Sequence, residues 1–347
     1  MVELLARPKS QPFARNRLLR DASWAAVYDA MKADASVHVF GEGAVVKAHY
    51  DAPAIERDFS HRVHTMPISE DGNTNFAVGA ALLGVTPIVD VIAADFLYRA
   101  MDSIANTAAK LDAVTGKPHT VVIRAETLIG GPTTGQRPEA MFAHIPGLRV
   151  VLPSTPHDSY GLMATALRTS GVTLFIEDRM IADAGPWLDG DLATGDAVPF
   201  GPPGVRLLPM NTTVRKMPLV TVLTYGIMRQ RVEAMLAPWL AAWDGDYYAE
   251  PNLSVDLLDM RSIYPFDLSS LTNGRFSLGR TGKLLIIEPD VKWNGVGAEI
   301  VAQISEALPH VRVRRLGCKR ETIPAAARLH KDLFPSDEEI IRAITDW

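Results

Sequence analysis

Cysteine is almost absent from this chain: Cys318 is the single one in 347 residues, which excludes an internal disulfide. Because no histidine or acidic cluster surrounds it in the sequence, it is expected to be a small buried residue in a protein of a reducing compartment. No pair of histidines or cysteines has metal-ligand spacing, so we expect no metal bound by this chain's side chains alone. These absences favour a cytoplasmic protein.

Long apolar runs and an excess of positive charge are also missing. The longest uncharged run, residues 72–89, is interrupted by asparagines, a glycine and a proline, so no segment is predicted to cross a bilayer. The net charge of −5 provides no electrostatic footprint for nucleic acid. We therefore expect neither a membrane nor a nucleic-acid partner. The basic bias of the first twenty residues predicts an exposed or partner-contacting arm.

Apolar runs of strand length alternate with helical patterns over residues 35–181, which predicts an α/β domain with a doubly wound parallel sheet. Residues 1–34 are expected to form an arm and a helix. Residues 182–217 are rich in glycine and proline and predict a connector. The alternation then returns over residues 218–347, which predicts a second, smaller α/β domain. Ligands of such sheets bind at the carboxyl ends of the strands.

The most informative segment is the turn Pro-Ile-Ser-Glu that ends at Glu70. A helix of small residues follows, and its glycines, Gly79 and Gly84, allow another backbone or a flat ligand to approach closely. Next come an apolar strand over residues 86–92 and a helical stretch with Phe96 near its start. Glu42 follows the first predicted strand, so Glu42, Glu70 and Phe96 all lie at or just beyond strand ends.

This order of elements resembles the pyrimidine-binding module of thiamine diphosphate enzymes. In detail it is similar to the beta subunit of the decarboxylating component of 2-oxo acid dehydrogenases, with transketolases as more distant relatives. Residues 221–226, 256–267 and 295–300 match the carboxy-terminal domain of those subunits, so the resemblance covers about residues 35–347. It implies that Glu70 binds the aminopyrimidine ring of thiamine diphosphate, that Phe96 stacks on this ring, and that Glu42 contributes to the same site.

Glu70 is the catalytic residue that the resemblance implies. A carboxylate bonded to the ring nitrogen N1′ favours the imino tautomer, in which the cofactor's own amine becomes basic. A charge-assisted hydrogen bond of this kind contributes about 1.5–3 kcal/mol. Offset stacking on Phe96 adds about 0.5–1.5 kcal/mol.

The chain lacks the Gly-Asp-Gly signature, with asparagine downstream, by which thiamine enzymes hold magnesium and the diphosphate. No Walker-type or Gly-x-Gly-x-x-Gly loop replaces it. The resemblance therefore implies an alpha-type partner that binds most of the Mg²⁺ and the diphosphate, and a lone chain without activity. It also implies a beta–beta dimer and an α2β2 heterotetramer, for which Gly79, Gly84 and an apolar stripe of Met228, Met235 and Trp239 are candidate contacts.

One loop departs from the family pattern. Where those subunits read Gly-Pro-x-His-Ser-Gln-Ser, with a histidine that serves acyl transfer, this chain has Thr134 at the histidine position, followed by Gln136 and Arg137. Threonine cannot carry a proton near neutral pH as imidazole does. Arg99 and Arg137 either form an anion site for a phosphorylated or carboxylated substrate, or pair with neighbouring acids or a partner. His144 matches a family histidine and is either near the pocket or a buried structural imidazole.

Three functions remain open at this point. The leading one is a beta-type subunit that decarboxylates a 2-oxo acid and transfers the acyl group to lipoamide, which adds a lipoyl-domain protein as a partner. The second is a split transketolase-like enzyme that transfers a two-carbon unit to a sugar phosphate or a biosynthetic intermediate, which Thr134, Arg99 and Arg137 favour. The third is a non-catalytic scaffold, against which the intact Glu70 and Phe96 argue.

Overall fold

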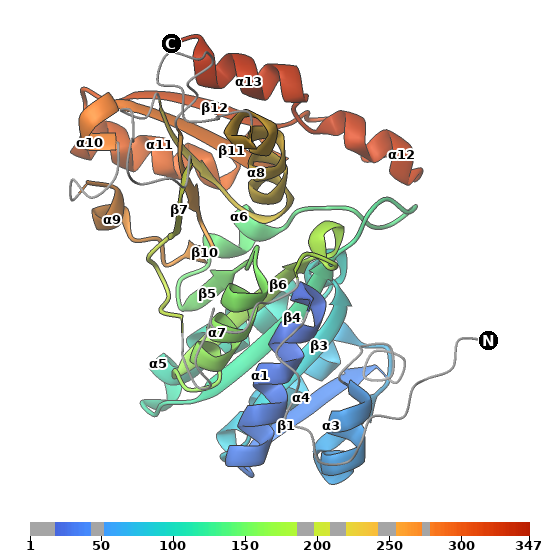
Figure 1. Cartoon of the computed structure of the whole chain (residues 1–347). Coiled ribbons are helices and arrows are strands. Elements are labelled where there is room, and N and C mark those ends of the chain that lie inside the picture. The colour runs from blue at the N-terminus through green and yellow to red at the C-terminus, as the bar shows by residue number, and fades with distance from the viewer. Residues whose placement is uncertain (1–17, 43–51, 186–197, 209–219, 242–254, 273–277) are drawn as a thin grey trace.

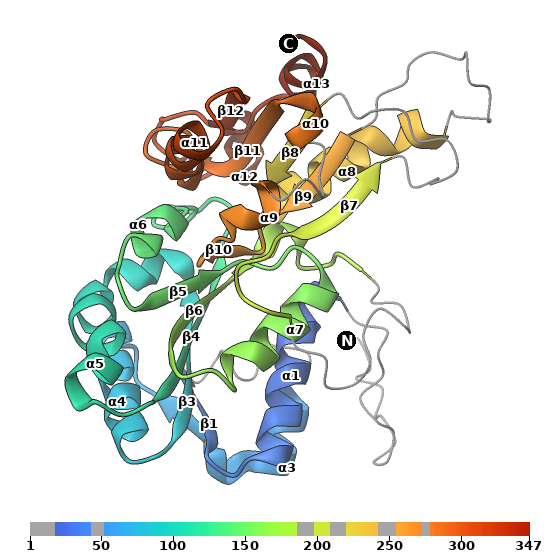
Figure 2. The same cartoon turned by 90° about the vertical axis from the view of Figure 1, so that its left-hand side faces the viewer.

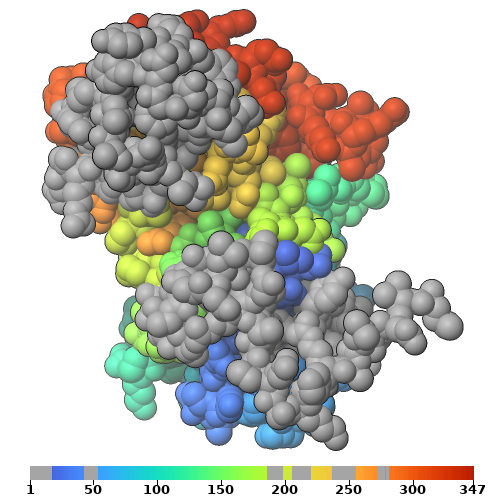
Figure 3. Space-filling model, viewed as in Figure 1, coloured from blue at the N-terminus to red at the C-terminus, as the bar shows by residue number. Residues whose placement is uncertain are grey.

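The computed structural model describes residues 18–42, 52–185, 198–208, 220–241, 255–272 and 278–347. They form two α/β units, each built on one sheet. In Figure 3 the amino-terminal residues (blue) lie in the lower part of the molecule and the carboxy-terminal residues (orange to red) in the upper part. No described helix is both long and apolar enough to cross a membrane.

The first sheet has seven strands in the order β10-β5-β6-β4-β3-β1-β2. All neighbouring pairs are parallel except β10 and β5. The strands are β1 (Val37–Glu42), β2 (Val63–Met66), β3 (Thr86–Ala93), β4 (Thr120–Thr127), β5 (Leu148–Val151), β6 (Gly171–Asp178) and β10 (Ser262–Tyr264). β3, β4 and β6 are buried along almost their whole length, as expected for central strands covered on both faces.

Helices cover both faces of this sheet, so the predicted doubly wound fold is confirmed. Figure 2 shows α1 (Leu19–Ala33) and α7 (Pro156–Ala166) on one side, and α4 (Glu70–Leu82) and α5 (Leu111–Thr115) on the other. α7 begins where sequence rules predict, because the Thr155 hydroxyl accepts a hydrogen bond from Asp158 N and Pro156 follows it. Two further helices are α3 (Ala52–Phe59) and α6 (Glu139–Ala143).

The second sheet has five strands in the order β12-β11-β8-β9-β7, with only the β7–β9 pair antiparallel. The strands are β7 (Gly204–Leu208), β8 (Val220–Thr224), β9 (Val255–Asp259), β11 (Lys283–Val291) and β12 (Arg312–Cys318). Its helices are α8 (Gly226–Ala241), α9 (Leu268–Thr272), α10 (Leu278–Thr281), α11 (Val296–Ala307), α12 (Ala327–His330) and α13 (Asp337–Thr345). A capping box between Ser336 and Glu339 starts α13.

Two strands cross the predicted division of the chain. β7 lies within residues 182–217, which were expected to be a connector without regular structure. β10 comes from the carboxy-terminal half but extends the first sheet. One hydrophobic cluster accordingly runs through both units and contains Leu152 and Tyr225. The domain boundaries remain a prediction, but the two units share a core.

Several local expectations can be compared with the structure. Cys318 is buried, as predicted. The apolar stripe on α8 is internal instead of a dimer contact, because Met228 and Met235 belong to the core between α8 and the second sheet; the Trp239 side chain lies outside the described residues. The helical stretch predicted around and after Phe96 is divided into short 3₁₀, π and α segments, including a π-helical turn at Ser103–Thr107. Such π-turns are frequent near functional sites.

Candidate active site

Glu70 is the first residue of α4 and is buried, with 6% of its surface exposed. The local sequence explains this position: Ser69 is the N-cap, and acids are favoured in the first turn of a helix. Asn73 and Thr74 hold the turn by bonds to Pro67 O and Glu70 O. The carboxylate is thus fixed at the edge of the sheet, where its Oε2 lies 3.2 Å from the Arg99 Nε.

Phe96 lies in the 3₁₀ turn Ala94–Tyr98 that follows β3 and packs, half-buried, against the main core. β3 ends irregularly before this turn. Its register with β4 shifts between Asp90 and Ala93, and Ile92 has a φ of 66°. A branched residue in this region of backbone conformation is strained, and such strain is concentrated at functional sites. The Asp90 carboxylate holds the bend by accepting a hydrogen bond from Ile92 N at 3.0 Å.

Glu42 is the last residue of β1 and is buried. Burial raises the pKa of its carboxyl, and the charges of Glu70 and Asp90 raise it further. The three acids therefore lie near one another at neighbouring strand ends. The raised pKa shifts the Glu42 carboxyl toward its protonated form, which donates a hydrogen bond that an ionised carboxylate cannot.

A network of buried charged side chains lies in the central strands of the same sheet. Arg124 in β4 is fully buried and contacts three acids: Glu126 of the same strand, Asp90 of β3 and Glu177 of β6. The ring of Trp24 in α1 covers its guanidinium at 5.0 Å. Burial raises the pKa of Glu177 to about 7 in spite of Arg124. Arg124 lies within β4, and its three acidic partners make it a structural hub that local sequence does not reveal.

The loop between β4 and α6 is fixed to the Phe96 turn. The Asp95 carboxylate accepts hydrogen bonds from Gly135 N at 3.1 Å and Gln136 N at 2.8 Å. The Thr134 hydroxyl donates to Gly130 O within the same loop. Asp95 was missed in the sequence, although its position next to Phe96 was the available signal. Through it, Thr134 and Gln136 are brought beside the candidate cofactor site.

Arg137 lies at the end of this loop but is 7% exposed and points into the junction of the two units. It contacts Asp178 at 2.7 Å and Glu139 at 3.3 Å. Asp178 in turn accepts a bond from Ile227 N at the start of α8. This arrangement matches the alternative of an arginine paired with neighbouring acids. No described contact joins Arg137 to Arg99, which is 75% exposed.

The histidines considered in the sequence lie outside the site. His144 follows α6 and is exposed instead of buried, because Phe142 occupies the side of this short helix that faces the core. His61 is exposed, as predicted. His64 is half-buried and stacks on His38, with 2.9 Å between their ring nitrogens. None of the three contacts Glu70 or Phe96 in the described part of the chain.

An apolar surface lies next to Glu70. Ile68, two residues before it, is 81% exposed, and Phe76 on α4 is 56% exposed. Leu82 and Leu83 extend this surface to the end of α4. A Cβ on Gly79 would meet no atom within 4 Å, so the outer face of the helix is open to close approach. Ile68 therefore does not shield Glu70 within this chain.

These residues fit one half of thiamine diphosphate. A buried carboxylate at a helix start and a half-buried aromatic ring match a flat aminopyrimidine, which needs a hydrogen bond and a stacking face. The described residues contain no group of three or more metal-ligating side chains. None of the described residues near Glu70 therefore matches a magnesium–diphosphate group.

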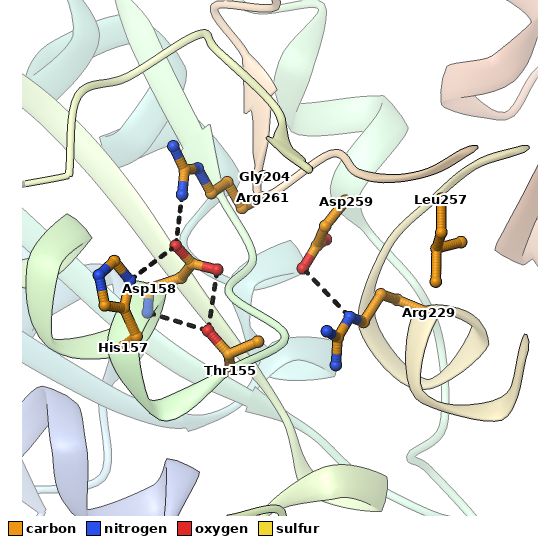
Figure 4. Close-up of a pocket in the computed structure, with 8 residues that line it drawn as sticks. All are labelled: Thr155, His157, Asp158, Gly204, Arg229, Leu257, Asp259 and Arg261. Carbon is orange, nitrogen blue, oxygen red and sulfur yellow. Dashed lines mark hydrogen bonds and ion pairs between the residues drawn. The ribbon is translucent and has the colours of Figure 1, made fainter. Parts of the chain in front are cut away.

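Apart from this candidate site, a hollow of about 250 Å³ lies at the junction of the two units (Figure 4). Its charged side chains are paired with each other: Arg261 contacts Asp158 at 2.5 Å, and Arg229 lies 3.9 Å from Asp259. Burial raises the pKa of Asp259 to about 7. The first pair joins α7 of the first unit to the segment between β9 and β10, and the second holds α8 against β9, so the hollow is part of the domain junction.

Comparisons with known proteins decide the family. Residues 17–183 match the model of the transketolase pyrimidine binding domain, and residues 212–340 match that of the transketolase C-terminal domain. The pyruvate dehydrogenase E1 component subunit beta of Porphyra purpurea is 34% identical over 300 residues, which are 83% of this chain and 82% of the relative. The chain belongs to the family of 2-oxo acid dehydrogenase beta subunits.

Other members of this beta-subunit family are similarly close. The 2-oxoisovalerate dehydrogenase subunit beta of Bacillus subtilis is 30% identical over 297 residues, 82% of this chain and 83% of the relative. A solved structure described as a split gene transketolase, inactive beta4 tetramer, is 18% identical, covers 94% of this chain and 97% of its own, and has a TM-score of 0.74. That likeness shows the fold alone. The matches to the family models and to the beta subunits confirm the resemblance inferred from the Pro-Ile-Ser-Glu turn and the thiamine diphosphate-dependent class.

Proposed function

We propose that this chain is the beta-type subunit of a thiamine diphosphate-dependent 2-oxo acid dehydrogenase, and that it contributes the pyrimidine half of the active site. The observation that carries the proposal is the pairing of buried Glu70 with the Phe96 turn at the strand ends. The bound cofactor supplies the electron sink for decarboxylation. The roles of this chain are to bind, orient and polarise the pyrimidine ring.

Glu70 accepts a hydrogen bond from the pyrimidine nitrogen in this arrangement, and its burial strengthens the bond. Arg99 contacts the same oxygen from the solvent side and, being 75% exposed, is free to move away. Phe96 provides the stacking face, and Asp95 fixes the loop that carries Thr134 and Gln136 at the substrate side. Arg99 and Gln136, both exposed, are the proposed substrate contacts. Arg137 and His144 are weaker candidates, because Arg137 is held in two ion pairs and His144 contacts neither Glu70 nor Phe96 in the described part of the chain.

The missing half of the site is assigned to an alpha-type partner that binds Mg²⁺ and the diphosphate. The exposed apolar surface of Ile68, Phe76, Leu82 and Leu83 is the proposed contact for that partner, because it borders Glu70 and would otherwise remain in water. Closure of this face would also exclude water from Glu70. The proposed assembly is α2β2, with an acyl acceptor on a lipoyl domain, in the cytoplasm.

The alternative, a split transketolase-like enzyme, is less well supported. The curated relatives with 28–34% identity are dehydrogenase beta subunits, whereas the split transketolase structure is 18% identical. Thr134 remains the observation that favours a different acceptor. An adjacent reading frame with Gly-Asp-Gly and a downstream asparagine would support the two-subunit class, and a neighbouring lipoyl-domain gene would support the lipoamide acceptor.

Calorimetry with magnesium and thiamine diphosphate tests the division of the site. The isolated chain is expected to bind the cofactor poorly, whereas the assembled complex binds it and decarboxylates a 2-oxo acid. Micromolar binding at full stoichiometry by the isolated chain would contradict the proposal. Light scattering tests the assembly: a β2 pair alone and a heterotetramer with the partner are expected, and a 37.8 kDa monomer that ignores the partner would refute it.

A further inference from the structure

His330 is the only buried histidine in the part of the chain that the structure describes, with 5% of its surface exposed. It is the last residue of α12, in the carboxy-terminal unit. Its Nδ1 is inaccessible to solvent and has no hydrogen-bond partner among the described residues. An unpaired polar atom in the interior destabilises the folded protein, so such an atom calls for a ligand or a function.

The segment before His330 packs directly on the loop between β4 and α6. Figure 1 shows this loop extending beneath α12. Gly131 N donates to Ala325 O at 2.9 Å, and a Cβ on Gly130 would meet the same oxygen at 2.9 Å. A Cβ on Gly135 would lie 3.6 Å from the His330 Cε1, the ring carbon between the two nitrogens. Glycine at residue 130 therefore lets the segment before His330 approach the loop, and glycine at residue 135 does the same for the imidazole.

The loop itself offers no proton carrier. The Thr134 hydroxyl is bonded to Gly130 O, and the Arg137 guanidinium is held by Asp178 and Glu139. The backbone of Gly135, against which His330 packs, is bonded to Asp95, the neighbour of Phe96. One glycine thus separates the imidazole from the turn that carries the stacking aromatic residue.

We propose that His330 supplies the imidazole of the substrate side of this site, where it hydrogen-bonds the carboxylate of the bound 2-oxo acid. The proposal rests on the proposed function, because it assumes that a 2-oxo acid reacts beside Phe96. It is supported by the contact with Gly135, by the unpaired buried nitrogen, and by the absence of another imidazole on the loop in the described chain.

The charges around His330 predict that the imidazole takes up a proton when an anionic ligand binds. Burial and the nearby Arg137 lower its pKa below the usual value, while Asp178 and Asp95 act in the opposite direction. The ring is therefore neutral near pH 7. A bound carboxylate adds negative charge beside the imidazole and raises its pKa. Ligand binding slightly above pH 6 should thus be accompanied by proton uptake at His330.

The test uses the assembled enzyme with magnesium, thiamine diphosphate and an acylphosphonate monomethyl ester, a singly charged analogue of a 2-oxo acid that cannot lose carbon dioxide. Titration calorimetry at pH 6.3 in buffers of different ionisation enthalpy measures the protons taken up on binding. Uptake is expected in the wild type and in His310→Gln, an exposed-histidine control, and is expected to be lost in His330→Gln. Analogue affinity should fall about tenfold in His330→Gln, with cofactor affinity unchanged.

Each result of this experiment either supports or overturns the role of His330. Binding of the analogue to the wild type without proton uptake overturns the role of His330, and so does equal uptake and affinity in His330→Gln. This wild-type measurement remains decisive even where the variant does not assemble, and His330→Asn gives a second variant of smaller volume. If the assembled enzyme binds neither cofactor nor analogue, the proposed function itself fails, and the assignment of His330 fails with it.

Discussion

Glu70 and Glu139 make an instructive pair, because each is a buried carboxylate at the first position of a helix and each contacts an arginine. The distances are almost equal, 3.2 Å from Arg99 to Glu70 and 3.3 Å from Arg137 to Glu139. The arginines differ in exposure. Arg99 has 75% of its side chain in solvent, and Arg137 has 7%.

The difference in exposure distinguishes a candidate ligand site at Glu70 from a structural ion pair at Glu139, at the junction of the two units. When one partner of an ion pair is exposed, water and salt replace the contact at little cost, so a ligand can displace Arg99 from Glu70. When both partners are buried, loss of either leaves an unpaired charge inside the protein. Arg137 also pairs with Asp178, which bonds the start of α8, so that its removal affects the contact between the units.

The largest effect, on turnover, is expected at Glu70, whose partner Arg99 is exposed. Glu70→Gln keeps the shape of the side chain and removes its charge, so turnover of the assembled enzyme should fall by about 10²–10⁴-fold, the span of a positioned proton-transfer group. Exchange of the cofactor C2 proton, followed by NMR, measures this directly. Cofactor affinity should change less, because the diphosphate is held elsewhere.

A neighbouring acid provides the control for this prediction. Asp71 lies in the same first turn of α4 but is half-exposed and contacts Asn75 at 3.3 Å. Asp71→Asn should retain turnover within about threefold, since surface changes have small effects. Wild-type proton exchange in Glu70→Gln would show that the comparison between the two carboxylates assigns the site to the wrong residue.

At the buried pair the effect should be on stability. Arg137→Met keeps most of the side-chain volume but leaves Asp178 and Glu139 without their cation. The free energy of unfolding is expected to fall by about 3–5 kcal/mol. Urea denaturation followed by circular dichroism measures it. A loss below about 1 kcal/mol would show that the domain junction does not depend on this arginine.

The junction should also respond to pH. Burial and the charge of Glu139 raise the pKa of Asp290 to about 8, against about 3.9 for an unfolded aspartate. The folded protein therefore holds a proton that the unfolded chain has released. The stability that this proton contributes is complete below pH 4 and is lost as the pH rises through about 8.

Asp290→Asn should reduce that pH dependence. The variant has no carboxyl at this position, so its unfolding free energy should fall less between pH 5 and pH 8.5 than that of the wild type. The difference between the two should be at most about a few kcal/mol, on the order expected from the pKa shift of Asp290. Thermal unfolding across this pH range measures it, with exposed Asp337→Asn in the parallel control. Identical pH profiles for wild type and Asp290→Asn would exclude Asp290 as the titrating group.

The smallest effect is expected for Arg99→Gln. Because Arg99 is largely in solvent, the unfolding free energy should change by less than about 1 kcal/mol. The same urea experiment compares it directly with Arg137→Met. A loss as large as that of Arg137→Met would mean that the Glu70 pair is as structural as the Glu139 pair, and the distinction between them would fail.

Much of the candidate site could be predicted from local sequence. The Pro-Ile-Ser-Glu turn, the small-residue helix and the following apolar strand placed Glu70 and Phe96 at strand ends, where the structure has them. These features depend on neighbours in the chain: an acid at a helix start, and branched residues in a central strand. Strand alternation likewise predicted the two α/β units, because its period is a local property.

Other residues could not be assigned in this way. Arg99 and Arg137 look alike in the sequence, and only their burial separates an exchangeable contact from a fixed one. β10 and the α12 segment come from the carboxy-terminal half, yet they extend the first sheet and pack on the 130–137 loop. Pairings of this kind join residues more than a hundred positions apart, and no local pattern records them.

The sequence by itself therefore determined the family, the two α/β units and the positions of Glu70 and Phe96 at strand ends, because each depends on short-range patterns of polarity, turn chemistry and residue size. Tertiary structure alone decided which buried charges are compensated, where the second unit meets the first, and that His330 lies against Gly135. The physical reason is that the energy of a charge or an imidazole is set by desolvation and by its neighbours in space, which exist only once the chain has folded.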